Sequence, residues 1–86
     1  MPRISYFYGI SIYIQHMDHN PPHIHAAYQS HKAQYSIAEA RILRGKMPPN
    51  ADRLISEWLR LRQADLIKDW ELAVIGKPVY PVLPLE

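Results

Sequence analysis

The chain has 86 residues, of which 48% are hydrophobic and 21% charged, with no cysteine and a formal net charge of +2. This length suits a single domain over residues 1–86, and the lack of cysteine excludes disulfides and sulfur-ligated zinc sites. No apolar run approaches the roughly 20 residues that a membrane helix needs, so we expect no membrane anchor and a cytoplasmic location.

The first half of the chain has the patterns of β-strands. Residues 3–8 are rich in β-forming residues, and residues 10–16 alternate strictly, with isoleucine at every second position from 10 to 14. Such alternation is typical of a strand with one buried face. It returns in residues 23–28 and 33–37, and a short fifth strand is expected around residues 41–43.

The second half of the chain changes to helical spacing. Two prolines and Asn50, which is the candidate N-cap, precede apolar residues that recur three and four positions apart over residues 50–75. The apolar stripes do not align across residues 62–65, so we expect one kinked helix or two consecutive helices. Trp58 and Trp70 lie in these stripes and are predicted core residues. The tail that follows has three prolines and is expected to be extended.

These elements predict an α+β fold. An antiparallel sheet of four to five strands, over about residues 3–44, is followed by the helical segment at about 50–75, which packs on one face of the sheet. The isoleucine face is the buried one. If the second and third strands pair as a hairpin, His23 and His25 stand on the opposite, more open face, beside hydroxyl and amide side chains.

Histidines are concentrated between these two strands, in the segment HMDHNPPHIH at residues 16–25. On a strand, His23 and His25 point the same way with their Cα atoms roughly 6–7 Å apart, so both imidazoles can reach one ion. His19 or Asp18 can supply a third ligand. With water in a fourth position, this set is typical of a site for zinc or a related divalent metal.

A metal-free chemistry can use the same side chains. His23 and His25 would act as general acid and base on a phosphodiester, with Asp18 orienting one imidazole and a nearby cation stabilising the phosphate. Residues 32–62 carry seven basic residues against three acidic ones. The candidates for binding phosphate or nucleic acid are Lys32, Arg41 and Arg44. The simpler interpretation is that the histidines are structural and the basic residues form a solvated surface.

The segment DHNPPHIHA at residues 18–26 resembles the hallmark of a family of small bacterial proteins, the domain-of-unknown-function family 4160. Further similar segments lie at residues 7–9, 45–48, 57–58, 69–72 and 76–78. The resemblance implies no established activity. It does imply a component of a small two-gene module of the toxin–antitoxin type, with a small protein partner encoded by a neighbouring gene.

Three classes of function therefore remain open. The first is a toxin–antitoxin-type component that binds a small protein partner and nucleic acid. The second is a histidine- or metal-dependent phosphodiester hydrolase built on His19, His23 and His25. The third is a non-catalytic interaction module whose histidine loop is structural. The first class is favoured at this point because it needs only a binding surface and fits the resemblance.

Overall fold

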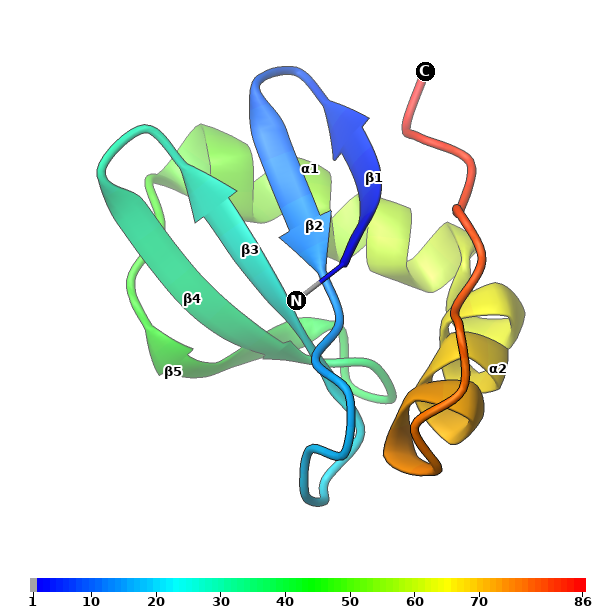
Figure 1. Ribbon diagram of the computed structural model, residues 1–86. Helices are drawn as coiled ribbons and strands as arrows, with labels where there is room; N and C mark the ends of the chain where they lie inside the picture. The colour runs from blue at the N-terminus through cyan, green and yellow to red at the C-terminus, as the bar shows by residue number, and fades with distance from the viewer. Residues whose placement is uncertain (1) are drawn as a thin grey trace.

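The computed structural model describes residues 2–86, which form a five-stranded antiparallel sheet followed by two helices (Figure 1). Each strand pairs with the next one along the chain, so the sheet order is the chain order. The strands are β1 Arg3–Phe7, β2 Ile10–Tyr13, β3 His23–Tyr28, β4 His31–Ser36 and β5 Arg41–Gly45, and the helices are α1 Pro49–Leu61 and α2 Gln63–Val74. The predicted α+β architecture is confirmed, with five strands and two separate helices.

The observed strands differ from the predicted ones mainly at their ends. β2 stops at Tyr13, three residues before the predicted end, although Ile14 is still fully buried. β4 begins at His31 rather than residue 33, because the turn after β3 consists of only two residues, Gln29 and Ser30. Gln29 has a φ of 54°, the left-handed conformation that a tight hairpin turn requires.

β5 lies very close to β4 at Gly45, where the chain needs a residue without a side chain. Gly45 has a φ of +93°, and a Cβ added there would lie 2.9 Å from the Cα of Ala33 and closer still to the carbonyl oxygen of Lys32. Only glycine adopts this conformation readily and leaves room for the neighbouring backbone.

Helix α1 begins at Pro49 with Pro48 in the N-cap position, so the expectation that Asn50 is the N-cap is wrong. Proline is favoured at the first helical position because its missing N–H would have no partner there. The chain turns at Arg62, whose φ of −115° lies outside the helical range, and α2 starts at the next residue.

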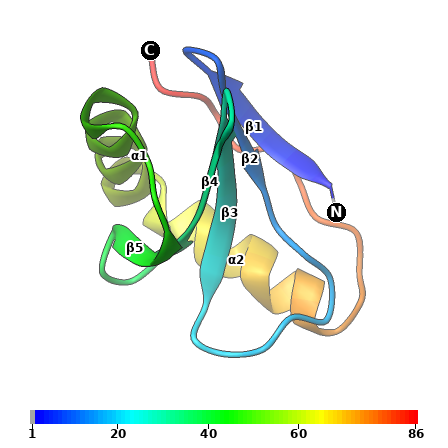
Figure 2. The ribbon, with the colours of Figure 1, turned by 90° about the vertical axis from the view of Figure 1, so that its left-hand side faces the viewer.

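Helix α1 covers one face of the sheet, and α2 lies at one end of it, close to the connection between β2 and β3 (Figures 1 and 2). The rings of Phe7 and Trp58 pack with their centroids 5.2 Å apart. Trp58 and Trp70 are 0% and 5% exposed, so both are core residues as predicted. The fully buried isoleucines are Ile10, Ile12, Ile14, Ile24, Ile37 and Ile55.

Polar side chains fix the helices on the sheet. The hydroxyl of Tyr35 on β4 donates a 2.6 Å hydrogen bond to Oδ1 of Asp52 in the first turn of α1. At the start of α2, Nε2 of Gln63 donates to the carbonyl oxygen of Ile37, at 2.9 Å. These bonds fix the starts of both helices relative to β4 and the residue that follows it.

Residues 77–86 contain neither helix nor strand and run back past both helices toward β1 (Figure 1). The backbone N–H of Val82 donates to the carbonyl oxygen of Ile4 at 2.8 Å, and Nε1 of Trp58 donates to the carbonyl oxygen of Leu83 at 2.8 Å. The tail therefore protects the outer edge of β1. None of the helices described within residues 2–86 has the length and apolar character needed to cross a membrane.

Candidate metal centre

The loop between β2 and β3, residues 14–22, is tied to the C-terminal end of α2. The backbone N–H of Met17 donates to the carbonyl oxygen of Ala73 at 2.8 Å. Nε2 of His16 lies 3.0 Å from the carbonyl oxygen of Lys77 and donates to it. His16 is therefore used to hold the loop in place.

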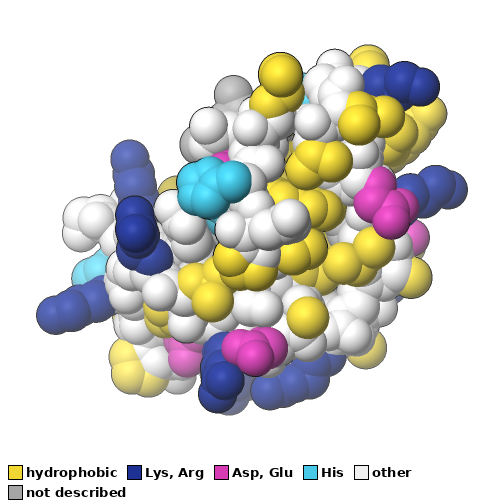
Figure 3. Space-filling model, turned by 90° about the horizontal axis from the view of Figure 1, so that it is seen from below, with side chains coloured by type: hydrophobic (Ala, Val, Ile, Leu, Met, Phe, Trp, Pro, Cys, Tyr) yellow, Lys and Arg dark blue, Asp and Glu magenta, His cyan; other side chains and the backbone are white. Residues whose placement is uncertain are grey.

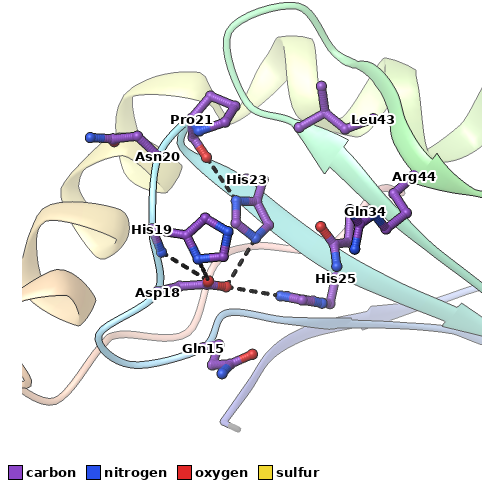
Figure 4. A pocket seen from close by; sticks show the side chains of 10 residues that line it. All are labelled: Gln15, Asp18, His19, Asn20, Pro21, His23, His25, Gln34, Leu43 and Arg44. Atoms are coloured by element: carbon purple, nitrogen blue, oxygen red, sulfur yellow. Dashed lines mark hydrogen bonds and ion pairs between the residues drawn. The ribbon is translucent and has the colours of Figure 1, made fainter.

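The carboxylate of Asp18 lies at the centre of three imidazole rings (Figure 4). Its Oδ2 atom is 2.9 Å from Nε2 of His23 and 3.3 Å from Nε2 of His25. Its Oδ1 atom accepts a 2.9 Å hydrogen bond from the backbone N–H of His19 and lies 3.2 Å from Nδ1 of the same residue. The Asp18 side chain is only 8% exposed, so these groups replace most of its contact with water.

The surroundings of Asp18 favour its ionised form. Burial raises the pKa of the carboxyl group, but the hydrogen bonds from the His19 backbone and the His25 ring and the charge interactions with His23 and His25 outweigh it. The net effect holds the pKa of Asp18 below its ordinary value. A carboxylate that is kept ionised and surrounded by imidazoles is a ready ligand for a cation.

One ring of this group has a fixed tautomer. Nδ1 of His23 lies 2.7 Å from the carbonyl oxygen of Pro21, and because a carbonyl oxygen can only accept, Nδ1 must carry a hydrogen. In a neutral imidazole, Nε2 is then unprotonated, and its lone pair faces the Asp18 carboxylate 2.9 Å away. Two acceptors at this distance require either a hydrogen or a metal ion between them.

His23 and His25 lie side by side on the face of β3 opposite the buried isoleucines, with ring centroids 5.1 Å apart, as the strand parity predicts. The expectation that both rings are open to solvent is wrong for His23, which is 4% exposed. The indole of Trp70 on α2 packs against its ring, with centroids 5.2 Å apart. The side chain of His25 is 19% exposed.

The ligand atoms that converge belong to Asp18, His23 and His25, and all lie within 4.8 Å of one another. We call these three residues the Asp18 centre. His19, the other candidate for the third position, is not part of this set, because its side chain is 93% exposed and it reaches only the outer oxygen of Asp18. Two imidazoles and a carboxylate are a recurrent ligand set for zinc and for non-haem iron and related metals.

A comparison with known protein families identifies the relationship of the chain. The family model described as a domain of unknown function (DUF4160) matches residues 9–71. The chain belongs to the DUF4160 family. This confirms the resemblance seen in the sequence, and the matched region contains the whole Asp18 centre. No curated protein and no solved structure was found to match the chain.

The Asp18 centre of this DUF4160 protein forms one wall of a hollow of about 380 Å³, which we call the first hollow. Gln34, Leu43 and Arg44 form the opposite wall (Figure 4). Seen from below, this end of the molecule has histidine beside apolar side chains, with lysine and arginine side chains projecting around it (Figure 3).

The predicted phosphate-binding residues fall into two groups. Arg44 lines the first hollow, and both Arg44 and Lys32 line a second one beside it. Arg41 lines neither, and its Nε atom is paired with Oε1 of Glu39 at 3.1 Å. The structure thus brings Arg44 to the Asp18 centre and leaves Arg41 with a partner of its own.

Sequence reasoning missed two contributors to this DUF4160 site, Pro21 and Trp70, and correctly placed a third, Gln34, on the face of His23 and His25. Pro21 fixes the His23 tautomer through its carbonyl oxygen, Trp70 covers the His23 ring, and Gln34 pairs with His25 across the sheet. The alternation of residues 33–37 indicates the outward face of Gln34. Nothing in the sequence pattern places Trp70 against His23, because that contact depends on how α2 docks.

Proposed function

We propose that the Asp18 centre binds one divalent transition-metal ion and that the protein is a metal-dependent phosphodiester hydrolase. The observation that supports the metal is the convergence of ligand atoms from Asp18, His23 and His25 within 4.8 Å, with Nε2 of His23 2.9 Å from the carboxylate. A metal ion bound by both groups would take the place of the hydrogen that otherwise joins them. The carbonyl oxygen of Pro21 would hold the His23 ring in the orientation needed for binding.

A metal held by three protein ligands keeps a position for water and lowers the pKa of that water toward neutrality. In hydrolysis, the water oxygen bonds to phosphorus, the ester P–O bond breaks, and the departing alkoxide takes up a proton. The first hollow is within the range of about 300–1,000 Å³ that is typical of ligand sites. Its partial enclosure by the loop limits competing solvent around the reacting group.

Arg44 supports a phosphate ester as the substrate. It lies across the first hollow from the Asp18 centre, and within residues 2–86 it forms no ion pair with a carboxylate. A guanidinium binds two phosphate oxygens at once and stabilises the charge that develops in the transition state. Phosphate held between the metal and Arg44 would be bound from both sides.

The decisive experiment uses protein without a histidine tag, stripped with a chelator and titrated with Zn²⁺, Mn²⁺ and Co²⁺ by calorimetry. We expect one ion per chain, with binding lost in Asp18→Asn and His25→Ala and kept in His31→Ala. His31 is the matched control because it is a strand histidine that lines neither hollow. Hydrolysis of bis(p-nitrophenyl) phosphate should depend on the added ion and follow the same pattern of variants.

Each alternative gives a different result in this experiment. Hydrolysis that survives the chelator would contradict the metal and favour acid–base catalysis by His23 and His25. Absence of both ion binding and hydrolysis would leave the histidine loop as a structural part of an interaction module. A toxin–antitoxin role with a small protein partner, which the family resemblance motivates, stays a prediction that co-expression with the neighbouring gene product can test.

A further inference from the structure

The open face of the sheet carries a second hollow, of about 450 Å³, directly beside the Asp18 centre. It shares His25, Gln34 and Arg44 with the first hollow, so the two are continuous. Its other lining includes Tyr13 and Lys32. The function proposed above uses the first hollow only and leaves this surface without a role.

The register of the sheet explains why these side chains meet. Tyr13 on β2 pairs with His25 on β3, His25 pairs with Gln34 on β4, and Gln34 pairs with Arg44 on β5. Residues paired in this way project from the same face of an antiparallel sheet. The result is one row across four strands, with an aromatic ring at one end, a guanidinium at the other and a ligand of the Asp18 centre between them.

The floor of the second hollow is made of small apolar residues. Ala27 lies two residues after His25 on the same face and pairs with Lys32, and Gly45 closes the side toward β5. Alanine and glycine leave space above the sheet where larger side chains would fill it. Tyr13 also lines this space, so the hollow offers an apolar surface next to an aromatic ring.

The rim of the hollow is basic. Lys32 and Arg44 are both exposed, and neither is paired with a carboxylate within the described chain. No acidic residue lines this hollow. The carboxylate of Asp18 lies 3.3 Å from the lining residue His25, and imidazoles already surround it. An anionic group on the rim would therefore meet unopposed positive charge.

We propose that the second hollow binds a nucleotide of single-stranded nucleic acid, with its base on the alanine floor beside Tyr13 and its phosphate on Lys32 and Arg44. This inference rests on the proposed function, because it places the next phosphate of the strand in the first hollow. The apolar floor favours a base over a bare phosphate, and an aromatic ring beside a basic rim is the usual arrangement for single strands. A duplex keeps its base faces stacked inside and cannot use such a floor.

The test measures binding rather than cleavage, so that it does not depend on the metal. Chelator-treated protein is titrated into a fluorescent single-stranded oligonucleotide and, separately, into the same sequence as a duplex. We expect Ala27→Leu, which fills the floor, to weaken single-strand binding at least tenfold. Ala64→Leu is the matched control, because Ala64 is exposed on α2 and lines neither hollow.

The basic rim has its own measurement. Lys32→Ala should weaken binding and reduce the slope of log affinity against log salt by about 0.7, the value for one phosphate contact with a single strand. Arg60→Ala removes an exposed charge on α1 away from the hollow and should leave the slope unchanged. We therefore expect the protein to bind the single strand more tightly than the duplex. Ala27→Leu and Lys32→Ala should weaken this binding, and the two control variants should not.

Failure of this inference can be told apart from failure of the proposed function. Equal affinity for single strand and duplex, or an Ala27→Leu variant that binds the single strand as the wild type does, would overturn the nucleotide site even if calorimetry shows a bound metal. Single-strand binding that needs Ala27 and Lys32 would support the site even if no metal binds at the Asp18 centre.

Discussion

The indole ring of Trp70 packs against the imidazole of His23, with ring centroids 5.2 Å apart and the planes inclined by 49°. His23 belongs to β3 and Trp70 to α2, so the contact joins the sheet to the second helix. The chain has two tryptophans, and the other, Trp58, is fully buried against Phe7. One of the two indoles therefore touches a candidate metal ligand.

This contact makes Trp70 a reporter of metal binding. Adding Co²⁺ or Ni²⁺ to stripped protein should quench part of the tryptophan fluorescence, because these ions quench a fluorophore at short range. In Trp70→Phe the remaining emission of Trp58 should respond far less. Quenching of equal size in both proteins would place the ion away from the Asp18 centre.

Substitution of the buried strand residue His23 should affect stability far more than substitution of the exposed loop residue His19. His23→Ala removes a ring that is 4% exposed, leaves the Pro21 carbonyl without its donor and takes a partner from Asp18. We expect the free energy of unfolding to fall by about 2–3 kcal/mol. His19→Ala should change it by about 0.5 kcal/mol or less, since that side chain is 93% exposed. Urea denaturation of both variants measures the difference, and equal losses would contradict the structure.

Asp69 predicts a pH dependence of stability. Its side chain is buried, Oδ1 accepts the backbone N–H of Tyr80 at 2.9 Å, and Oδ2 has no partner within residues 2–86. Burial, assisted by the charge of Asp65, raises the pKa of Asp69 above 3.8 despite the Tyr80 bond and the charge of Lys68. Between 3.8 and the raised value the folded state binds more protons than the unfolded state, so this group lowers stability as pH rises.

The variant Asp69→Asn lacks this titration. Compared with the wild type, its free energy of unfolding should therefore increase as pH rises above 3.8 and level off above the raised pKa of Asp69. The exposed Glu71 on the same helix provides the control, since Glu71→Gln removes a charge that stays in water. A difference between Asp69→Asn and wild type that does not vary with pH would show that Asp69 titrates normally.

Gly45 should tolerate no side chain. In Gly45→Ala the new Cβ would meet the Lys32 carbonyl oxygen and lie 2.9 Å from the Cα of Ala33, and alanine would have to adopt a φ near +93°. The left-handed conformation alone costs about 1–2 kcal/mol, so we expect a loss of stability of at least that size. Gly76→Ala is a useful comparison: its φ is also positive, but the nearest atom to an added Cβ is Sδ of Met17, at 3.9 Å. Equal melting temperatures for the two variants would contradict the close approach of β5 to β4.

The local pattern of the sequence was enough for the order and type of the elements. The isoleucine alternation correctly identified the buried face, and the change to helical spacing correctly located the helices. The end of β2 was missed for a physical reason: Ile14 remains fully buried although the chain has left the sheet there. The buried stretch therefore extends past the last paired residue of the strand. A hydrophobic pattern indicates burial and does not indicate where strand pairing ends.

The candidate site was predictable to the extent that it depends on strand parity. The shared face of His23 and His25 follows from their spacing and is observed. The burial of His23 depends on Trp70, 47 positions along the chain, and the choice of Asp18 over His19 depends on the loop, where Met17 takes a φ of 58°. Contacts between distant segments and single left-handed residues leave no periodic trace in a sequence.

The bond from Met17 to Ala73 joins the loop of the Asp18 centre to the last turn of α2. An ion bound as proposed at this centre would stabilise the docked helix together with the loop, and at one hundred times its dissociation constant it would add about 2.7 kcal/mol to the free energy of unfolding. Scarcity of the ion would loosen the helix, and a helix displaced by other means would release the ion. The concentration of the ion and the stability of the fold would in this way depend on each other.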